Sequence, residues 1–315
     1  MTSMQKVSHS EAESFLSCRR KHFYGYVKDG GLKPNVSASA LTRGSFLHEC
    51  LEVYYNVCLA AGNTSKEQRA AHKDAVAAAL DFYKERTSEK GEGEHFDDTP
   101  PSGRRSVYEA LFDYYFPNEA LVRTGWVVQA VELKVSLELE IDEDTTYQYP
   151  FVVDLIALDP NGKTVVIDHK FVYDFYSPDD VDLFTQLPKY LGALRAGDFP
   201  ADYAAYNMIR NRSKKNAELE DVVKFLPVKP PTFQVQDVMS EQITVAADII
   251  GIKAMDEEAA EAVAYRSASA ITCRGCDFSN ICRTERVGGD IGPTLAIDFT
   301  VKDPDKAFEA DFTIN

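Results

Sequence analysis

The sequence predicts an α/β or α+β protein in which helices surround a sheet that contains a β-hairpin. Helical periodicity dominates the first 125 residues, and alternating strand patterns begin at Trp126. The turn sequence Asp159-Pro160-Asn161-Gly162 then joins two strand-like runs. With 315 residues, of which 44% are hydrophobic and 27% charged, the chain can bury a substantial core. Its net charge of −16 argues against a generally basic surface that coats nucleic acid, but leaves room for a local basic groove or an acidic metal site.

Three helices are expected in the N-terminal part. The first follows a capping box at Ser8–Glu11, and Ser10–Glu13 is an equally good register. The second runs from about residue 43 to 55, and the third follows a capping box at 65–68. The polar residues 87–106, which include glycines and prolines, predict a mobile loop.

Four strands are expected after this loop, and the hairpin turn joins the second to the third: 127–139, 149–158, 163–170 and 203–209. A helix over 183–194 precedes the last strand, and another over 237–265 follows it. From Val287 the chain is acidic and at first glycine-rich, so we expect a tail that is not fully ordered.

The cysteines have an informative spacing. Three of the six form a C-x2-C-x5-C pattern: Cys273, Cys276 and Cys282. Thiolates this close suit zinc or an iron–sulfur cluster, each of which takes four ligands. Cys18 is the best fourth candidate, because Cys50 and Cys58 lie in an apolar helical stretch typical of buried thiols. Packing alone is the alternative for all six, and six cysteines are too few for a disulfide scaffold, which favours a reducing compartment.

Two aspartates flank the hairpin. Asp154 ends the run Phe151-Val152-Val153, and Asp168 lies on the strand across from it. Two carboxylates at a strand edge repel unless a cation lies between them, which predicts a Mg²⁺ or Mn²⁺ site. Lys170 follows Asp168 by two residues and so points to the same face of the strand, where it can orient a metal-bound water. Taken alone, such a D-x-K pattern is also typical of an exposed ion pair.

The order of these motifs, from about Ser8 to Cys282, resembles that of PD-(D/E)xK nucleases of the RecB/Cas4 type. Cys18 precedes basic and aromatic residues, Gly44–His48 matches a G-x3-H motif ahead of Leu51-Glu52, and the C-terminal cysteines complete the order. The sequence departs from the family pattern in two places: no glycine precedes Asp154 in Phe151-Val152-Val153, and His169 stands where an aromatic residue is usual.

The resemblance implies a restriction-endonuclease-like mixed sheet flanked by helices, with the N- and C-terminal segments clasped by a [4Fe–4S] cluster. The implied segments are a helical region at 1–125, a nuclease core at 126–236, a helix and cysteine cluster at 237–286, and an acidic tail at 287–315. The implied catalytic residues are Glu132, Asp154, Asp168, Lys170, Gln186 and Tyr190. The implied ligands of Mg²⁺ or Mn²⁺ are His48, Asp154, Asp168 and the main-chain carbonyl of His169. Those of the cluster are Cys18, Cys273, Cys276 and Cys282.

The implied function is a metal-dependent DNA exonuclease that hydrolyses phosphodiester bonds of single strands or DNA ends in replication or recombination. Candidate phosphate-binding residues, which would otherwise be solvated charges, are Arg19, Arg20, Arg43, Arg210 and Arg212. Two other classes stay open: a non-catalytic DNA-end-binding subunit of a recombination or spacer-acquisition complex, and an iron–sulfur redox sensor. The sequence has no P-loop motif, so a helicase or recombination protein would be a separate partner. It also has no apolar run long enough for a membrane span and no secretory signal, so we expect a cytoplasmic protein, in the host cytoplasm if it is phage-encoded.

Overall fold

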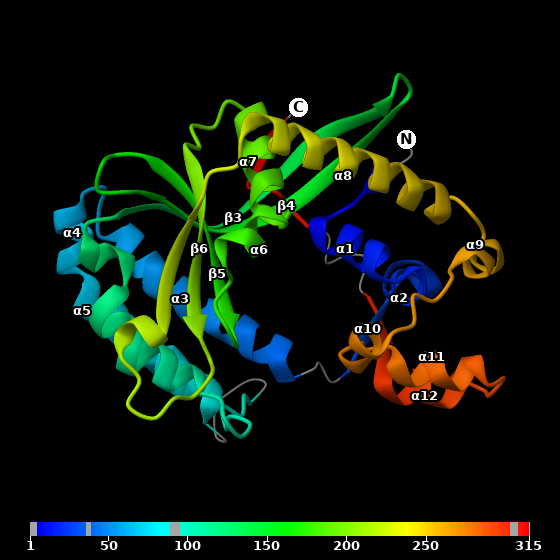
Figure 1. The fold of residues 1–315 in the computed structure, drawn as a ribbon, viewed down its shortest axis with the longest axis horizontal. Coiled ribbons are helices and arrows are strands. Elements are labelled where there is room, and N and C mark those ends of the chain that lie inside the picture. Colours follow the sequence, from blue (N-terminus) through cyan, green and yellow to red (C-terminus); the bar gives the residue numbers. More distant parts are fainter. Residues whose placement is uncertain (1–4, 36–38, 89–94, 303–307, 315) are drawn as a thin grey trace. The chain divides into compact units, whose positions relative to one another are not determined.

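The computed structural model describes residues 5–35, 39–88, 95–302 and 308–314 (Figure 1). The chain divides into two compact units, each assembled from separate stretches of sequence. Unit 1 comprises Met1–Ser39, Lys134–Phe151 and Asp237–Asn315. Unit 2 comprises Ala40–Leu133 and Val152–Gln236. Neither unit is therefore a continuous piece of the sequence.

The main sheet has seven strands in the order β7-β6-β5-β4-β3-β9, and β1 pairs with β4 off this path. The strands are β1 (Gln5–Lys6), β3 (Val127–Asp142), β4 (Thr145–Leu158), β5 (Thr164–Val172), β6 (Tyr203–Arg210), β7 (Val223–Val228) and β9 (Phe312–Ile314). The β4–β5 and β6–β7 pairs are antiparallel, whereas β5–β6 and β3–β9 are parallel. The predicted class, a mixed sheet flanked by helices, is confirmed.

The helices of unit 2 are α3 (Ser39–Ala60), α4 (Ser65–Ala70), α5 (His72–Thr87), α6 (Pro178–Asp182) and α7 (Gln186–Ala196). Its short helical segments are η3 (Glu109–Glu119), η4 (Leu121–Thr124) and η5 (Leu219–Asp221). Apolar side chains of α3, η3, β4 and β5 form its core, including the fully buried Leu47, Tyr115 and Ile167.

The capping box of α4 begins at Thr64 rather than at the predicted Ser65. Thr64 Oγ1 accepts from the Glu67 main chain, and the Glu67 carboxylate accepts from the Thr64 main chain.

Unit 1 contains mostly short helices: α1 (His9–Ser17), α2 (Arg19–His22), η1 (Phe23–Val27), η2 (Lys28–Gly30), α9 (Glu257–Val263), α10 (Ala270–Arg274), α11 (Ser279–Arg286) and α12 (Gly292–Asp298). The long helix α8 (Thr232–Lys253) begins in unit 2 and continues into unit 1, and β2 (Leu32–Pro34) pairs with β8 (Phe299–Val301). Ser8 caps α1 by accepting from the Glu11 main chain. The Glu11 carboxylate binds the side chains of His22 and Lys253. Of the predicted capping box, the structure therefore shows the cap by the Ser8 side chain.

Several expected elements differ from those observed. The helix expected over 237–265 is two helices, α8 and α9, and the helix expected over 183–194 begins only at Gln186. Strand β7 was not expected because it contains Pro227, which an edge strand tolerates since its outer main-chain groups need no partner. In the tail that was expected to be incompletely ordered, the described residues form α12, β8 and β9, of which β8 and β9 pair with other strands, and 303–307 and 315 lie outside the described residues. Part of the predicted mobile loop, 89–94, lies outside the described residues, and Phe96 beyond it is buried.

Among the described residues, no helix is long and apolar enough to cross a membrane.

Candidate functional site

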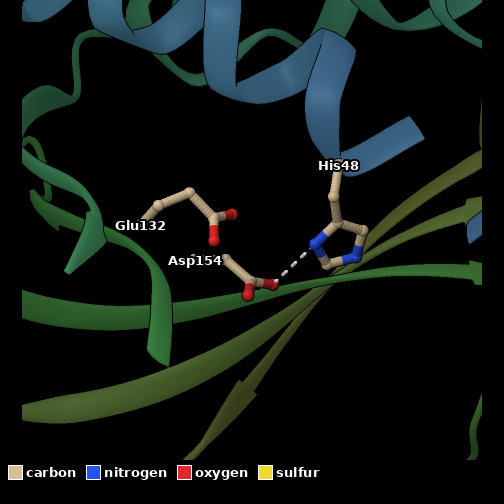
Figure 2. Close-up of side chains that lie close together, drawn as sticks. All are labelled: His48, Glu132 and Asp154. Atoms are coloured by element: carbon tan, nitrogen blue, oxygen red, sulfur yellow. Dashed lines mark ion pairs between the residues drawn. The ribbon is translucent and has the colours of Figure 1, made fainter. Parts of the chain in front are cut away.

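Three potential metal ligands converge within unit 2 (Figure 2). His48 comes from α3, Glu132 from β3 and Asp154 from β4. One ligand atom of each lies within 4.8 Å of the others, and His48 Nδ1 is 3.5 Å from Asp154 Oδ2. All three side chains are half-buried, so the group combines one nitrogen and two carboxylates at a partly shielded position.

Glu132 has an unusual main-chain conformation. Its φ of 48° lies in the left-handed region, although Glu132 is inside the strand β3. A non-glycine residue held there costs of order 1 kcal/mol or more, and such outliers gather at functional sites. A local irregularity also changes the direction in which a side chain leaves its strand. Figure 2 shows the Glu132 carboxyl directed towards Asp154.

The main chain of His169 orients two of the three ligands. Its carbonyl is 2.9 Å from His48 Nε2, and because a carbonyl can only accept, Nε2 donates. In the neutral ring, the lone pair is then on Nδ1, the atom that faces Asp154. The His169 N–H donates to Asp154 Oδ2 at 2.8 Å. The predicted role of this carbonyl as a metal ligand stays a prediction.

A second polar group adjoins these ligands. Lys170 Nζ donates to Asp168 Oδ1 at 3.0 Å and to Gln186 Oε1 at 3.1 Å. Gln186 Nε2 in turn donates to Asp168 Oδ1 at 2.9 Å and to Tyr190 Oη at 3.2 Å. The two-residue spacing on β5 and the four-residue spacing on α7 place each pair on one face of its element.

The electrostatics of the site call for a cation. Burial, and then the neighbouring Asp168 carboxylate, raise the pKa of Asp154 to about 6. Asp168 is only 4% exposed, and its buried Oδ2, although 2.8 Å from Lys170 Nζ, makes no hydrogen bond of good geometry. Carboxylate oxygens and one imidazole nitrogen, arranged around crowded negative charge, fit a divalent cation of the Mg²⁺ or Mn²⁺ kind.

Lys170 keeps its positive charge. Burial by itself lowers the pKa of Lys170, but the charge and hydrogen bond of Asp168 outweigh that effect and leave the pKa above its ordinary value. At neutral pH the side chain is therefore an ammonium, which donates hydrogen bonds and cannot take up a proton.

The His169 ring belongs to the core. It stacks on Tyr55 with centroids 5.6 Å apart, and its Nδ1 accepts from Asn207 Nδ2 at 2.9 Å. Burial lowers the pKa of His169 well below its ordinary value, so the ring is neutral. At position 169 the family resemblance predicts an aromatic side chain. The imidazole of His169, stacked on Tyr55, occupies that place.

A sequence model of the PD-(D/E)XK nuclease superfamily matches residues 6–283. The chain belongs to this superfamily. A search of curated proteins gives no match. Among solved structures, this PD-(D/E)XK chain is similar to the crystal structure of SSO0001, with 15% sequence identity and a TM-score of 0.30. The similar region covers 56% of this chain and 62% of that one, which is less than two thirds of the other chain's length.

In unit 1 of this PD-(D/E)XK protein, all four cysteines of the predicted cluster line one pocket of about 170 Å³. Cys18 lies between α1 and α2, Cys273 on α10, Cys276 just after it, and Cys282 on α11. The fold thus brings together cysteines from near the two ends of the sequence. The other two, Cys50 and Cys58, are fully buried in the core of unit 2, as expected for packing residues.

The walls of this pocket are cationic. Among the described residues that line it, none is Asp or Glu, and five carry positive charge: Arg20, Lys21, Arg266, Arg283 and Arg286. Arg266 Nε donates to Cys282 Sγ at 3.3 Å. Cysteine binds metal as the thiolate, and burial raises the pKa of the Cys276 thiol in this pocket. The lining is therefore basic although the chain as a whole has a net charge of −16.

Glu285 holds the arginines of the pocket in place. Its carboxylate accepts from Arg20 Nε at 2.9 Å and from Tyr24 Oη at 2.7 Å, and it also pairs with Arg266. Sequence reasoning missed Arg266 because it lies outside the cysteine spacing and no local pattern links it to Cys282.

The five arginines predicted to bind phosphate are divided between the two units. Arg19, in unit 1, lies over the Phe15 ring and pairs with Asp248. Arg20 is 5% exposed and engaged with Glu261 and Glu285, and Arg43 is buried beside Asp98. The remaining two, Arg210 and Arg212 in unit 2, share the carboxylate of Asp174 at 3.1 Å each.

Proposed function

We propose that this nuclease-superfamily chain is a metal-dependent DNA exonuclease that hydrolyses phosphodiester bonds of single strands or DNA ends. The observation that carries the proposal is the convergence of His48, Glu132 and Asp154 next to Asp168 and Lys170. A site built only for structure has no need to crowd carboxylates until the pKa of one of them rises.

The metal ligands are His48, Glu132, Asp154 and Asp168. A Mg²⁺ or Mn²⁺ ion held there supplies a water of lowered pKa and neutralises charge on the scissile phosphate. Glu132 joins this set because it lies with His48 and Asp154. Asp168 Oδ1 accepts from Lys170 and Gln186, which leaves its Oδ2 for the cation. The hydrogen bond from His48 to the His169 carbonyl keeps the Nδ1 lone pair available.

Lys170 positions the attacking water and stabilises the negative charge that develops on the phosphate. Its raised pKa makes it a donor rather than a general base. Gln186 bonds both Lys170 and Asp168, so it fixes the distance between ammonium and carboxylate. Tyr190 supports the Gln186 amide, and burial raises the pKa of Tyr190 far above neutrality, so it acts as a neutral phenol.

The second part of the proposal is a [4Fe–4S] cluster held by Cys18, Cys273, Cys276 and Cys282. Four thiolates around one zinc ion, each ~2.3 Å from the metal, lie within roughly 4 Å of one another and leave no internal space. A pocket of about 170 Å³ lined by all four cysteines favours the larger group. The cluster serves the architecture of unit 1, where it joins the N-terminal helices to α10 and α11.

The setting we propose is DNA replication or recombination in the cytoplasm, of the host cell if the chain is phage-encoded. Strand separation then falls to a separate helicase or recombination partner, because the sequence lacks a P-loop.

The test is digestion of 5′- and 3′-end-labelled single- and double-stranded DNA by anaerobically purified protein with Mg²⁺, Mn²⁺ or EDTA. The variant Asp168→Ala removes a carboxylate of the site, and Asp179→Ala removes an exposed aspartate of α6 as the matched control. We expect cleavage from ends that needs metal and is lost only in Asp168→Ala.

The two rival classes predict different results. A DNA-end-binding subunit binds labelled ends equally well in wild type and Asp168→Ala and cleaves in neither. A redox sensor keeps its cluster and its partner binding in Asp168→Ala and changes both when the cluster is oxidised. Cleavage at internal positions of circular DNA would contradict the exonuclease proposal while leaving a nuclease.

A further inference from the structure

A surface of unit 2 lies just beyond the strand that carries Asp168 and Lys170. Three segments meet there: 103–105, 172–175 and 210–213. The Asn211 N–H donates to the Val172 carbonyl at 2.8 Å, and Arg104 forms an antiparallel bridge with Arg212. The Ser213 N–H donates to the Gly103 carbonyl at 2.9 Å. These main-chain bonds fix the three segments to one another.

Arg105 anchors this arrangement from below. Its side chain is 1% exposed, pairs with Glu109 at 2.9 Å and donates to the Arg212 carbonyl. A buried guanidinium that binds main-chain carbonyls makes the surface above it rigid, and a preorganised surface binds a ligand at lower entropic cost.

On this surface, guanidinium groups lie over aromatic rings. Tyr173 is 44% exposed, and the guanidinium carbons of Arg104 and Arg212 lie 5.0 Å and 5.4 Å from its ring centroid. The Arg210 guanidinium lies 4.4 Å from the Phe175 ring. We name these five residues the platform: Arg104, Tyr173, Phe175, Arg210 and Arg212.

The charge of the platform is positive. It carries three guanidinium groups, and the carboxylate of Asp174 is shared by Arg210 and Arg212 at 3.1 Å each. Asp174 and Arg212 are each about half exposed, at 53% and 52%, so their ion pair is weak in water and a phosphate can replace it. On a chain of net charge −16, such a patch attracts an anion to one place.

The platform is also close to the candidate active site along the chain. Tyr173 follows Lys170 by three residues at the end of β5, a distance of about 10 Å in an extended strand.

We propose that the platform binds single-stranded DNA, with a base stacked on Tyr173 and the neighbouring phosphates held by Arg104, Arg210 and Arg212. Stacking on an exposed ring requires an unpaired base, since the bases of a duplex are already stacked, and this selects a single strand over a duplex. The proposal deepens the proposed nuclease function, on which it rests for the choice of DNA as the occupant. Of the platform residues, sequence reasoning had named only the two arginines at 210 and 212.

Binding can be measured without cleavage. Fluorescence anisotropy of labelled dT20, dT20·dA20 duplex and rU20 with the full-length wild-type protein in EDTA gives Kd as a function of salt. The variants are Tyr173→Ala, Tyr173→Phe and the pair Arg104→Gln with Arg212→Gln. Tyr108→Ala, which removes another partly exposed tyrosine of unit 2, is the matched control.

For dT20 we expect Tyr173→Ala to weaken binding about tenfold or more, Tyr173→Phe and Tyr108→Ala to change it less than about twofold, and the arginine pair to reduce the salt slope by about 1.4. If Tyr173→Ala and the arginine pair both bind dT20 with wild-type affinity, the platform is not the binding site for DNA. A Tyr173 effect confined to the duplex overturns the single-strand assignment, and one confined to rU20 overturns DNA as the occupant.

Cleavage with Mn²⁺ separates this proposal from the nuclease itself. For Tyr173→Ala we expect a raised KM on dT20 with an unchanged kcat, and unchanged cleavage of dT2, which is too short to reach from the site to Tyr173. If the wild type cleaves nothing, the proposed nuclease function fails. The anisotropy measurement alone then tests whether the platform binds single-stranded DNA. If all variants cleave dT20 with the wild-type KM, the platform fails and the nuclease stands.

Discussion

The acidic site of unit 2 and the cysteine pocket of unit 1 differ in the charges that surround their candidate ligands. In unit 2, burial and then the neighbouring Asp168 carboxylate raise the pKa of Asp154 to about 6. In unit 1, arginines and a lysine line the cysteine pocket, and Arg266 donates directly to Cys282. The protein compensates the second site with its own side chains and leaves the first short of positive charge.

This difference teaches what each site is built to hold. An acidic site that is short of cations suits an ion that exchanges and takes part in a reaction on an anionic phosphate. A thiol pocket already matched with cations suits a permanent anionic centre with a structural task. The comparison predicts that the two sites can be disabled independently.

The largest effect is expected from Asp154→Asn. The amide keeps the size of the side chain but loses the charge that holds a cation, so Mn²⁺-dependent cleavage should fall about 10³-fold or more. Iron and sulfide content should stay at the wild-type level because the cysteines belong to unit 1. Single-turnover cleavage and iron analysis measure both, with Asp81→Asn, whose side chain is 81% exposed, as control. Loss of iron in Asp154→Asn would show that the two sites are not independent.

The next effect concerns the pocket. Cys276→Ala removes one proposed cluster ligand, so bound iron should be lost and the Tm of unit 1 should fall by about 10 °C, which corresponds to a few kcal/mol. Cys50→Ala is the matched control, because it removes a buried cysteine of unit 2 and should leave the iron content unchanged. Absorbance near 400 nm and calorimetry measure the two quantities. If Cys276→Ala retains full iron content, the assignment of the pocket is wrong.

A smaller effect is expected from pH. Since the folded-state pKa of Asp154 is about 6 and its ordinary value 3.8, the folded protein binds the proton more tightly than the unfolded chain. Stability from this group is therefore full below pH 4 and is lost as the pH rises through 6, by up to about 3 kcal/mol. Urea unfolding in EDTA should show this fall in wild type but not in Asp154→Asn, and Mn²⁺ should offset it above pH 6. An identical pH profile for the two proteins would contradict the crowding of charge.

Much of the acidic site could be predicted from the sequence, because strand and helix periods place Asp168 with Lys170 and Gln186 with Tyr190 on common faces. The close grouping of Glu132 with His48 could not, since it depends on the left-handed φ of Glu132. Cysteine spacing likewise predicts the pocket but not Arg266, and no pattern in 103–105 points to Arg104. Long-range partners are fixed by tertiary packing, which local periodicity does not encode.

The smallest expected effect in this comparison of the two sites is that of Arg266→Lys. Lysine keeps the positive charge of the pocket wall but cannot reproduce the flat guanidinium that bonds Cys282 Sγ with Nε and reaches Glu285 with its terminal nitrogen. Hydrogen bonds to cluster sulfurs raise the reduction potential. A bond worth ~1 kcal/mol corresponds to about 40 mV for one electron, so the midpoint should become more negative by roughly that amount.

The control for this last change is Arg274→Lys, an exposed arginine between Cys273 and Cys276. EPR-monitored redox titration of both variants gives the midpoints, while cleavage of dT2 by Arg266→Lys should equal that of wild type. An unchanged midpoint in both variants would mean that charge alone sets the potential and that the bond to Cys282 contributes nothing. A shift confined to Arg266→Lys, with cleavage unchanged, would place the tuning of the cluster in unit 1 and the chemistry in unit 2.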